Sequence, residues 1–221
     1  MYKRQAQYAN SKTSYTFLYQ NTLNLSDNYA HGGAVMLDSM NYFDASAACT
    51  VIGETLLTKA QLQQYKADYT ALLGYVEYAG YVPSTNQMFW IQDNVASLNE
   101  GSSSFNFFKP TKYASSSFPV LCTQARGTSN YGGSATAANS FTVAGDNGTS
   151  YVGFRNQKSF RFQGLRYATF PGRFQYTTPY TGSGALTNAT SYGPQCKQYG
   201  SGSEDCFYLN VFTRKLWKQV S

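Results

Sequence analysis

Hydrophobic positions in the first half of the chain switch between strand and helix spacing. Residues 32–43, GGAVMLDSMNYF, predict a short strand that runs into a helix capped by Asp44 and ended by Gly53. The apolar positions on the inner face of this helix are Ala45, Ala48, Cys49 and Ile52.

A second helix is marked by a capping box from Thr58 to Gln61 and extends to Gly80. Its apolar stripe at helical spacing consists of Leu62, Tyr65, Tyr69, Leu72, Leu73 and Val76, which we interpret as core. Two apolar runs, 88–91 and 118–122, predict buried strands.

The pattern changes after residue 123, where small and polar residues replace large apolar ones. A hairpin follows, with strands around Phe141–Val143 and Tyr151–Phe154 and a turn at 145–148. Residues 160–165 predict a third strand, and 206–212, CFYLNVF, a buried one. The predicted organisation is an N-terminal module at 28–125, a linker at 126–140, a second domain at 141–213 and an unrelated tail at 214–221.

The amino-acid composition indicates the class of protein and shows an uneven distribution of charge along the chain. Aromatic residues make up 17% of the 221 residues and charged residues only 13%, which indicates a folded chain with a polar, weakly charged surface. No apolar run is long enough for a transmembrane helix. Residues 1–150 carry a net charge of −1 and residues 151–221 carry +7. A polyanion-binding surface is one interpretation of that basic segment, but no nucleic-acid-binding motif accompanies it, so we expect no nucleic-acid partner.

Cysteines and glycosylation sequons favour an oxidising compartment. Four cysteines allow three pairings, and none forms a Cys-x-x-Cys motif. Sequons at Asn24, Asn147 and Asn188 are candidate glycosylation sites. The segment MYKRQAQY is not followed by the apolar stretch of a signal peptide, so we expect a secretion signal to lie outside this sequence.

The segment SEDCFYLNVFT, residues 203–213, resembles the second signature of the type-B carboxylesterase and lipase family, approximately EDCLYLNV. Three further blocks resemble that family in the same order: Gly153-Phe154-Arg155, FQGLRYATFPGRF at 162–174, and ATSYGPQC at 189–196. The resemblance covers residues 141–213. Within this α/β-hydrolase family, the segment is most similar to the fungal members, which are secreted. The resemblance implies the first antiparallel strands of a hydrolase domain.

The resemblance also implies specific contacts. It implies a disulfide between Cys196 and Cys206, and with it a Cys49–Cys122 pair. It implies a structural salt bridge between Arg173 and Glu204. The family has proline where this chain has Arg166, leucine where it has Phe207, and proline after its equivalent of Thr213, where Arg214 stands here.

The catalytic machinery of that family is absent from these 221 residues. There is no Gly-x-Ser-x-Gly elbow and no His-Gly-Gly oxyanion loop, and the sequence GSGS at 200–203 has the wrong spacing for an elbow. His31, the only histidine, precedes every matching block and is interpreted as a turn residue. We therefore expect no catalytic residue, cofactor or metal ligand here, and a carboxylic ester substrate only for the complete enzyme.

The N-terminal module shows a fainter likeness. Its order of Cys49, two helices, the strand around Trp90 and Cys122 resembles C-type-lectin-like domains. Their calcium-binding signatures are missing, and Gln92-Asp93-Asn94 supplies few oxygen ligands. The sequence thus predicts an α+β chain, with a lectin-like module before an incomplete α/β-hydrolase domain. The favoured function is part of a secreted carboxylic ester hydrolase; the alternative is a small secreted carbohydrate- or surface-binding protein, in which Trp90 and exposed tyrosines contact a glycan.

Overall fold

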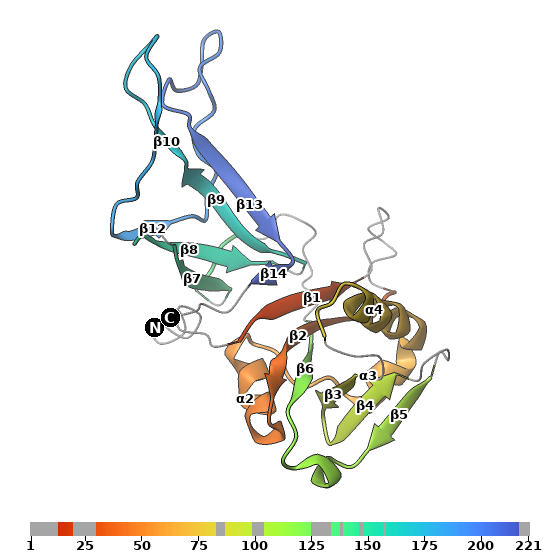
Figure 1. Ribbon diagram of the computed structural model, residues 1–221. Coiled ribbons are helices and arrows are strands. Elements are labelled where there is room, and N and C mark those ends of the chain that lie inside the picture. The colour runs from red at the N-terminus through yellow and green to blue at the C-terminus, as the bar shows by residue number, and fades with distance from the viewer. Residues whose placement is uncertain are drawn as a thin grey trace. The chain divides into compact units, whose positions relative to one another are not determined.

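The computed structural model describes residues 13–19, 30–82, 87–98, 104–124, 134–137, 139–145, 148–156 and 158–216. These residues form two compact units, one from the described residues of 13–130 with 215–216, the other from the described residues of 131–214. We call them the helix-containing unit and the all-strand unit, and describe each by itself (Figure 1). The prediction of a mixed α+β chain is confirmed.

The helix-containing unit is built on a seven-stranded sheet with the order β14-β1-β2-β6-β3-β4-β5. Its strands are β1 Tyr15–Tyr19, β2 Gly33–Met40, β3 Met88–Ile91, β4 Asn94–Leu98, β5 Phe105–Phe108, β6 Phe118–Thr123 and β14 Lys215–Leu216. Neighbouring strands are antiparallel except β3 and β6, which pair in parallel at Trp90 and Val120. The tail predicted to be unrelated thus supplies β14 to this sheet.

Three α-helices accompany the sheet: α2 Tyr42–Val51, α3 Lys59–Gln64 and α4 Lys66–Tyr78. The α2 N-cap is Asn41, whose side chain accepts from the backbone N–H of Asp44, so the predicted cap at Asp44 is wrong by three residues. The capping box of Thr58 and Gln61 is confirmed. The predicted long second helix is interrupted at Tyr65, which separates α3 from α4.

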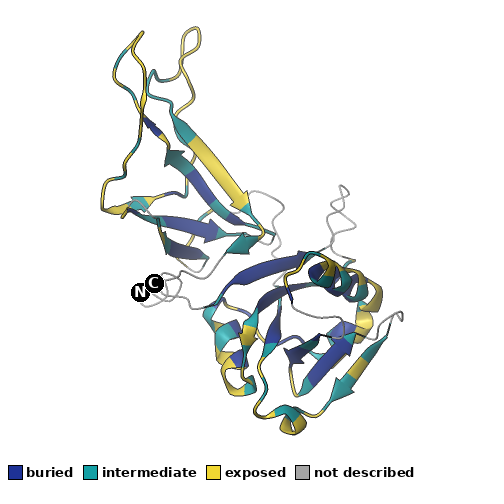
Figure 2. Cartoon of the chain, viewed as in Figure 1, coloured by how far each residue is buried: buried dark blue, intermediate teal, exposed yellow. Residues whose placement is uncertain are grey.

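Strand alternation places the helices on opposite faces of the sheet. Leu121 of β6 belongs to the core cluster under α3 and α4, together with Leu73 and Val76 of α4. The next residue, Cys122, points the other way and is joined to Cys49 of α2 by a disulfide with a Cα–Cα distance of 5.6 Å. The sheet is therefore covered on both faces, and its central strands are buried on both sides (Figure 2).

A neighbouring segment packs closely against the break at Tyr65. Gly32, which leads into β2, packs so tightly on this corner that a Cβ there would lie 2.6 Å from the Cβ of Tyr65. The Tyr69 hydroxyl donates to the carbonyl of Gly33 at 2.9 Å, which ties the start of α4 to the same segment. Side-chain periodicity carries no trace of this contact, because the inner stripe continues across the break.

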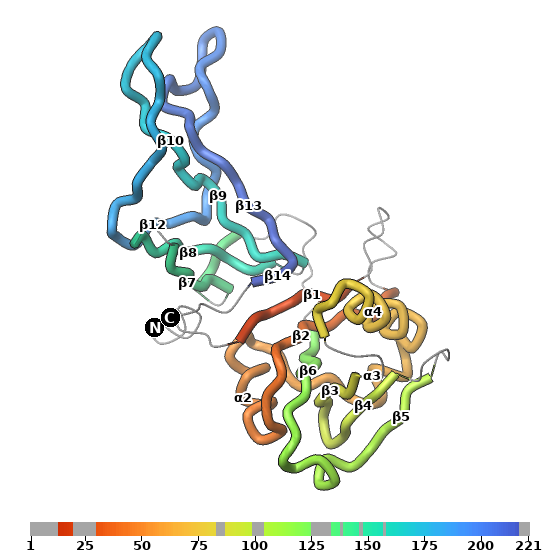
Figure 3. The backbone as a smooth tube through the Cα atoms, in the orientation of Figure 1, coloured from red at the N-terminus to blue at the C-terminus, as the bar shows by residue number. Residues whose placement is uncertain are grey.

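The all-strand unit contains a sheet with the order β12-β8-β9-β13, to which β7 adds by pairing with β8 (Figure 3). Its elements are β7 Ser140–Ala144, β8 Ser150–Arg155, β9 Phe160–Arg166, β12 Leu186–Asn188, β13 Tyr208–Thr213 and the short pair β10 Ala168–Thr169 and β11 Thr178–Pro179. The β7–β8 hairpin and β9 occur where the sequence predicts them. The core here includes Phe141, whose ring lies 5.4 Å from that of Phe160 and 5.3 Å from that of Phe162.

The segment 206–212 was predicted as a buried strand, and the burial part of that prediction is wrong. The strand β13 forms, and its backbone pairs with β9. Leu209, Val211 and Phe212 remain 40%, 38% and 50% exposed, because no described element covers this strand. Apolar composition predicted the strand, but burial depends on whether something packs against it.

Candidate functional site

The residues that carry the esterase resemblance converge on two loops of the all-strand unit. One loop, residues 170–177, joins β10 to β11, and the other, residues 195–207, leads into β13. Ring contacts link them, since Phe170 and Phe207 lie 6.3 Å apart between centroids. We treat these two loops and the side chains between them as the candidate site.

A disulfide-closed hairpin forms the second loop. Cys196 and Cys206 are bonded, with a Cα–Cα distance of 4.9 Å, so both cysteine pairs implied by the resemblance are present in the structure. Gln198 and Ser201 exchange backbone hydrogen bonds at 2.9 and 3.2 Å across the tip. Gly202 has a φ of +92°, and a Cβ there would lie 2.4 Å from the carbonyl oxygen of Cys196, so the turn requires glycine.

An ion pair joins the two loops. The Arg173 guanidinium donates to Glu204, with 66% and 38% of the two side chains exposed. The hydrogen bond that Arg173 donates to Glu204, together with the negative charge of Glu204, raises the pKa of Arg173 above its ordinary value. Because the pair is exposed to solvent, it fixes the relative position of the loops more than it stabilises the fold.

A second, better-protected ion pair was not foreseen from the sequence. Arg166 donates to both carboxylate oxygens of Asp205, at 2.9 and 2.8 Å, and its Nε donates to the carbonyl of Ala168 at 3.1 Å. The guanidinium also lies 5.7 Å from the ring centroids of Tyr180 and Tyr208. The sequence contains a signal for this second pair. Two adjacent carboxylates, Glu204 and Asp205, follow two arginines, Arg166 and Arg173, so each arginine can pair with one carboxylate.

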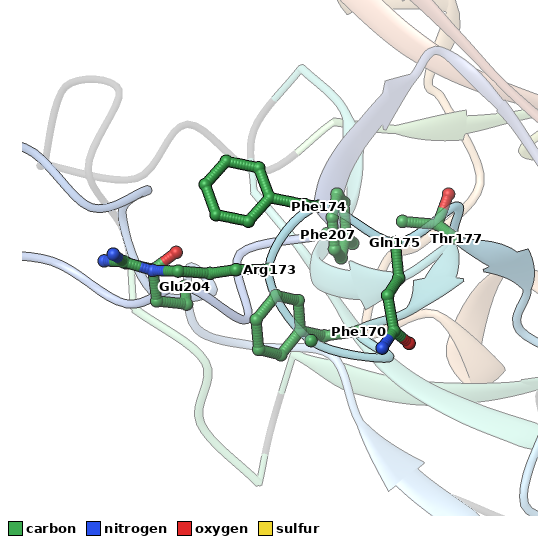
Figure 4. Close-up of a pocket in the computed structure, with 8 residues that line it drawn as sticks. Phe170, Arg173, Phe174, Gln175, Thr177, Glu204 and Phe207 are labelled. Atoms are coloured by element: carbon green, nitrogen blue, oxygen red, sulfur yellow. The ribbon is translucent and has the colours of Figure 1, made fainter.

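A pocket of about 410 Å³ lies between the loops. It is lined by Phe170, Gly172, Arg173, Phe174, Gln175, Thr177, Glu204 and Phe207. Figure 4 shows the rings of Phe170, Phe174 and Phe207 around it, with the Arg173–Glu204 pair at one side. Phe174 is fully exposed and has a left-handed φ of +61°, so its ring projects from the turn into solvent.

The pocket contains no pair of groups suited to nucleophilic catalysis. Its only hydroxyl group is that of Thr177, and no histidine belongs to this unit. Ser201 lies at the tip of the disulfide hairpin, and Ser203 Oγ accepts from the backbone N–H of Asp205 at 3.2 Å. The GSGS segment is therefore a hairpin turn, without the strand-to-helix geometry of a nucleophile elbow.

His31 has a structural environment in the helix-containing unit. Its Nδ1 lies 2.9 Å from Oδ1 of Asp68, and Oδ2 of Asp68 accepts from the backbone N–H of Gly32 at 2.7 Å. Asp68 is buried on α4, so this carboxylate fastens the segment before β2 to the helix. Within the described ranges, no group of three or more His, Cys, Asp or Glu side chains is arranged to hold a metal ion.

In the helix-containing unit, Trp90 is placed differently from the expectation that it contacts a glycan. Trp90 is fully buried, and its indole N–H donates to the carbonyl of Met40 at 2.7 Å, so it offers no stacking surface. Gln92 and Asp93 form the two-residue turn between β3 and β4, with Asp93 at a φ of +56°. Among the described residues of this unit, the exposed large aromatic side chains are Phe43, Tyr75, Tyr78 and Tyr81.

Among the candidate glycosylation sites, Asn188 is exposed on β12, whereas Asn24 and Asn147 lie outside the described residues. In that described portion of the chain, no helix has the length and apolarity needed to cross a membrane. No protein-family model, curated protein or solved structure matches this chain.

Proposed function

We propose that residues 141–213 are the amino-terminal part of a secreted type-B carboxylesterase or lipase domain. Two contacts carry the proposal. The Cys196–Cys206 disulfide closes the second loop, and the Arg173–Glu204 ion pair joins the second loop to the first. The sequence resemblance alone implies both links. A chance match of short sequence blocks would have no reason to bring the corresponding side chains together.

The uncovered face of β13 adds independent support. A strand with Leu209, Val211 and Phe212 partly exposed is typical of a sheet that continues or is covered in a larger domain. In this proposal the strands β7, β8, β9 and β13 serve as scaffold. The complete domain would hydrolyse carboxylic esters through an acyl-serine intermediate, with its nucleophile, histidine and oxyanion donors supplied by residues other than these 221.

The test is to read the transcript that encodes the chain beyond the codon for Thr213. We expect an in-frame continuation that encodes proline, a His-Gly-Gly loop and a Gly-x-Ser-x-Gly elbow in some transcript of this gene. Transcripts that all end at the Ser221 codon would overturn the proposal. In parallel, the purified 221-residue protein should neither hydrolyse a short p-nitrophenyl ester nor react with a serine-directed fluorophosphonate; labelling of a serine would contradict the scaffold role.

A second candidate function, glycan binding by the helix-containing unit, is favoured by its exposed tyrosines. Tyr75 and Tyr78 lie one turn apart on α4, 48% and 90% exposed, and Tyr81 follows at 39%. Exposed rings of this kind stack on the apolar faces of sugars. Binding to a glycan array that is lost in Tyr78→Ala but kept in Phe43→Ala would support this function, while an array without signal would exclude it for the glycans displayed.

A further inference from the structure

The sequons at Asn147 and Asn188 differ in what the fold does with their hydroxyl residue. In the sequon that starts at Asn147, the third residue is Thr149, which is fully buried. Its hydroxyl oxygen accepts from the backbone N–H groups of Ser183 and Gly184, at 3.0 and 3.4 Å. That hydroxyl is used to fasten the loop before β12 to the start of β8.

The sequon at Asn188 has the opposite arrangement. Strand alternation turns Ala189 inward, where it is fully buried, and turns Asn188 and Thr190 to the other face. The Thr190 hydroxyl donates to Oδ1 of Asn188 at 2.7 Å. The acceptor amide and the hydroxyl of the motif are therefore side by side on an accessible face.

The backbone holds this arrangement in place. The N–H of Ala189 donates to the carbonyl of Val152 on β8 at 2.8 Å, and its carbonyl accepts from Gln163 on β9 at 2.7 Å. Thr190 engages Oδ1 of Asn188, whereas the Nδ2 atom of this exposed side chain makes no hydrogen bond among the described residues. Two residues earlier on the same face, Leu186 is 64% exposed, so no packed layer of protein obstructs a bulky substituent there.

From these observations we propose that Asn188 is an N-glycosylation site of this protein. The donor is a lipid-pyrophosphate-linked oligosaccharide of the secretory pathway. The Nδ2 atom forms a bond to the anomeric carbon of the first sugar, the bond from that carbon to the pyrophosphate oxygen breaks, and Nδ2 loses one proton. The lipid pyrophosphate leaves with the bonding electrons. The carbonyl Oδ1 is unchanged, so the hydrogen bond from Thr190 is retained in the product.

This site extends the proposed function without depending on it, because a glycan on β12 requires only passage through a glycosylating compartment. The two disulfides are consistent with such a compartment. Loss of the esterase proposal would leave the site standing, and an unmodified Asn188 would leave the esterase proposal standing.

The test uses the full chain, secreted from a eukaryotic host behind an added leader. The purified protein is treated with peptide N-glycosidase in ¹⁸O-labelled water and mapped by mass spectrometry, so that a former glycan at Asn188 appears as labelled aspartate. We expect the label at position 188 in the unsubstituted chain and in Thr190→Ser, which keeps the hydroxyl. We expect its complete loss in Thr190→Val, which keeps the shape but removes the hydroxyl.

The unsubstituted chain decides the question even if Thr190→Val is not secreted. An unlabelled peptide containing position 188, from protein that the host has secreted, overturns the proposal. Label that persists at position 188 in secreted Thr190→Val also overturns it, because the modification would then not follow the sequon.

Discussion

The two units differ most in how completely their sheets are covered. In the helix-containing unit, β2 and β6 are buried along most of their length, and helices lie on both faces. In the all-strand unit, β8 and β9 have buried positions, but β13 is largely exposed from end to end (Figure 2). Both units have a disulfide, so the difference lies in packing and not in crosslinking.

This contrast shows which unit has the features of a self-sufficient domain. Burial of apolar area is the main favourable contribution to folding, and the helix-containing unit encloses Trp90, Phe17, Phe89 and a cluster of aliphatic side chains. The all-strand unit buries a smaller aromatic cluster and leaves apolar side chains of β13 in solvent. Its ion pairs and its disulfide hold the two loops of the candidate site in place. This is the role expected of a scaffold in the larger domain proposed above.

The largest expected effect concerns the enclosed core. Trp90→Ala removes a fully buried indole and leaves the carbonyl of Met40 without its donor, so it should destabilise the helix-containing unit by about 3–5 kcal/mol. Hydrogen–deuterium exchange should rise in peptides from β3, β4 and β6 and stay unchanged in peptides from β8 and β9.

The matched control is Tyr78→Ala, because Tyr78 is 90% exposed on α4 of the same unit. It should change the unfolding free energy by no more than about 0.5 kcal/mol. Faster exchange in both units after Trp90→Ala would show that the two units unfold together, which would remove the distinction drawn here.

Much of the helix-containing unit follows from local pattern. The capping box at Thr58, the strand at 88–91 and the inner face of α2 are all present as expected, because each depends on residues a few positions apart. The break at Tyr65 lies against Gly32, more than thirty residues earlier, and β14 pairs with β1 near the other end of the chain. Contacts between such distant segments leave no periodic signal.

The candidate site shows the same division. The cysteine and arginine–glutamate partners were implied by a family resemblance, which carries information about distant contacts. Arg166 was noted only as a departure from the family pattern, and its partnership with Asp205 became evident from the geometry of β9 and the loop before β13. Composition predicts a buried strand at 206–212, yet β13 is exposed, since composition cannot report whether a covering element is present.

The second prediction compares the two ion pairs of the candidate site. Arg166 makes a bidentate, partly buried pair with Asp205, so Arg166→Ala should destabilise the all-strand unit by about 1–2 kcal/mol. Arg173→Ala removes an exposed pair and should leave the urea midpoint unchanged within error. Arg166→Lys, which keeps the charge but not the planar fork, should resemble Arg166→Ala more than the unsubstituted protein. If Arg166→Ala and Arg173→Ala lowered the unfolding free energy equally, the partly buried pair would not stabilise the unit more than the exposed pair, and this comparison would be wrong.

The smallest expected effect on stability, and the most direct test of the contrast, concerns the exposed strand. Val211→Thr and Phe212→Thr place polar, strand-compatible side chains on β13, where the present residues are 38% and 50% exposed. Because both side chains are only partly buried, and Phe212 packs under the Arg161 guanidinium at 5.3 Å, the unfolding free energy should fall by at most about 1 kcal/mol. Self-association, measured by sedimentation velocity, should fall, since an apolar strand at a sheet edge favours pairing with other copies.

Phe162→Thr on the neighbouring strand β9 serves as the control. Phe162 is buried and its ring lies 5.3 Å from that of Phe141, so the same replacement should destabilise the unit by about 3 kcal/mol. If the β13 substitutions proved as costly as this one, β13 would be covered in solution, and the interpretation of the all-strand unit as part of a larger domain would lose its structural support. If β9 is buried and the neighbouring β13 is open to solvent, the loss of unfolding free energy should be small for the β13 substitutions and large for Phe162→Thr.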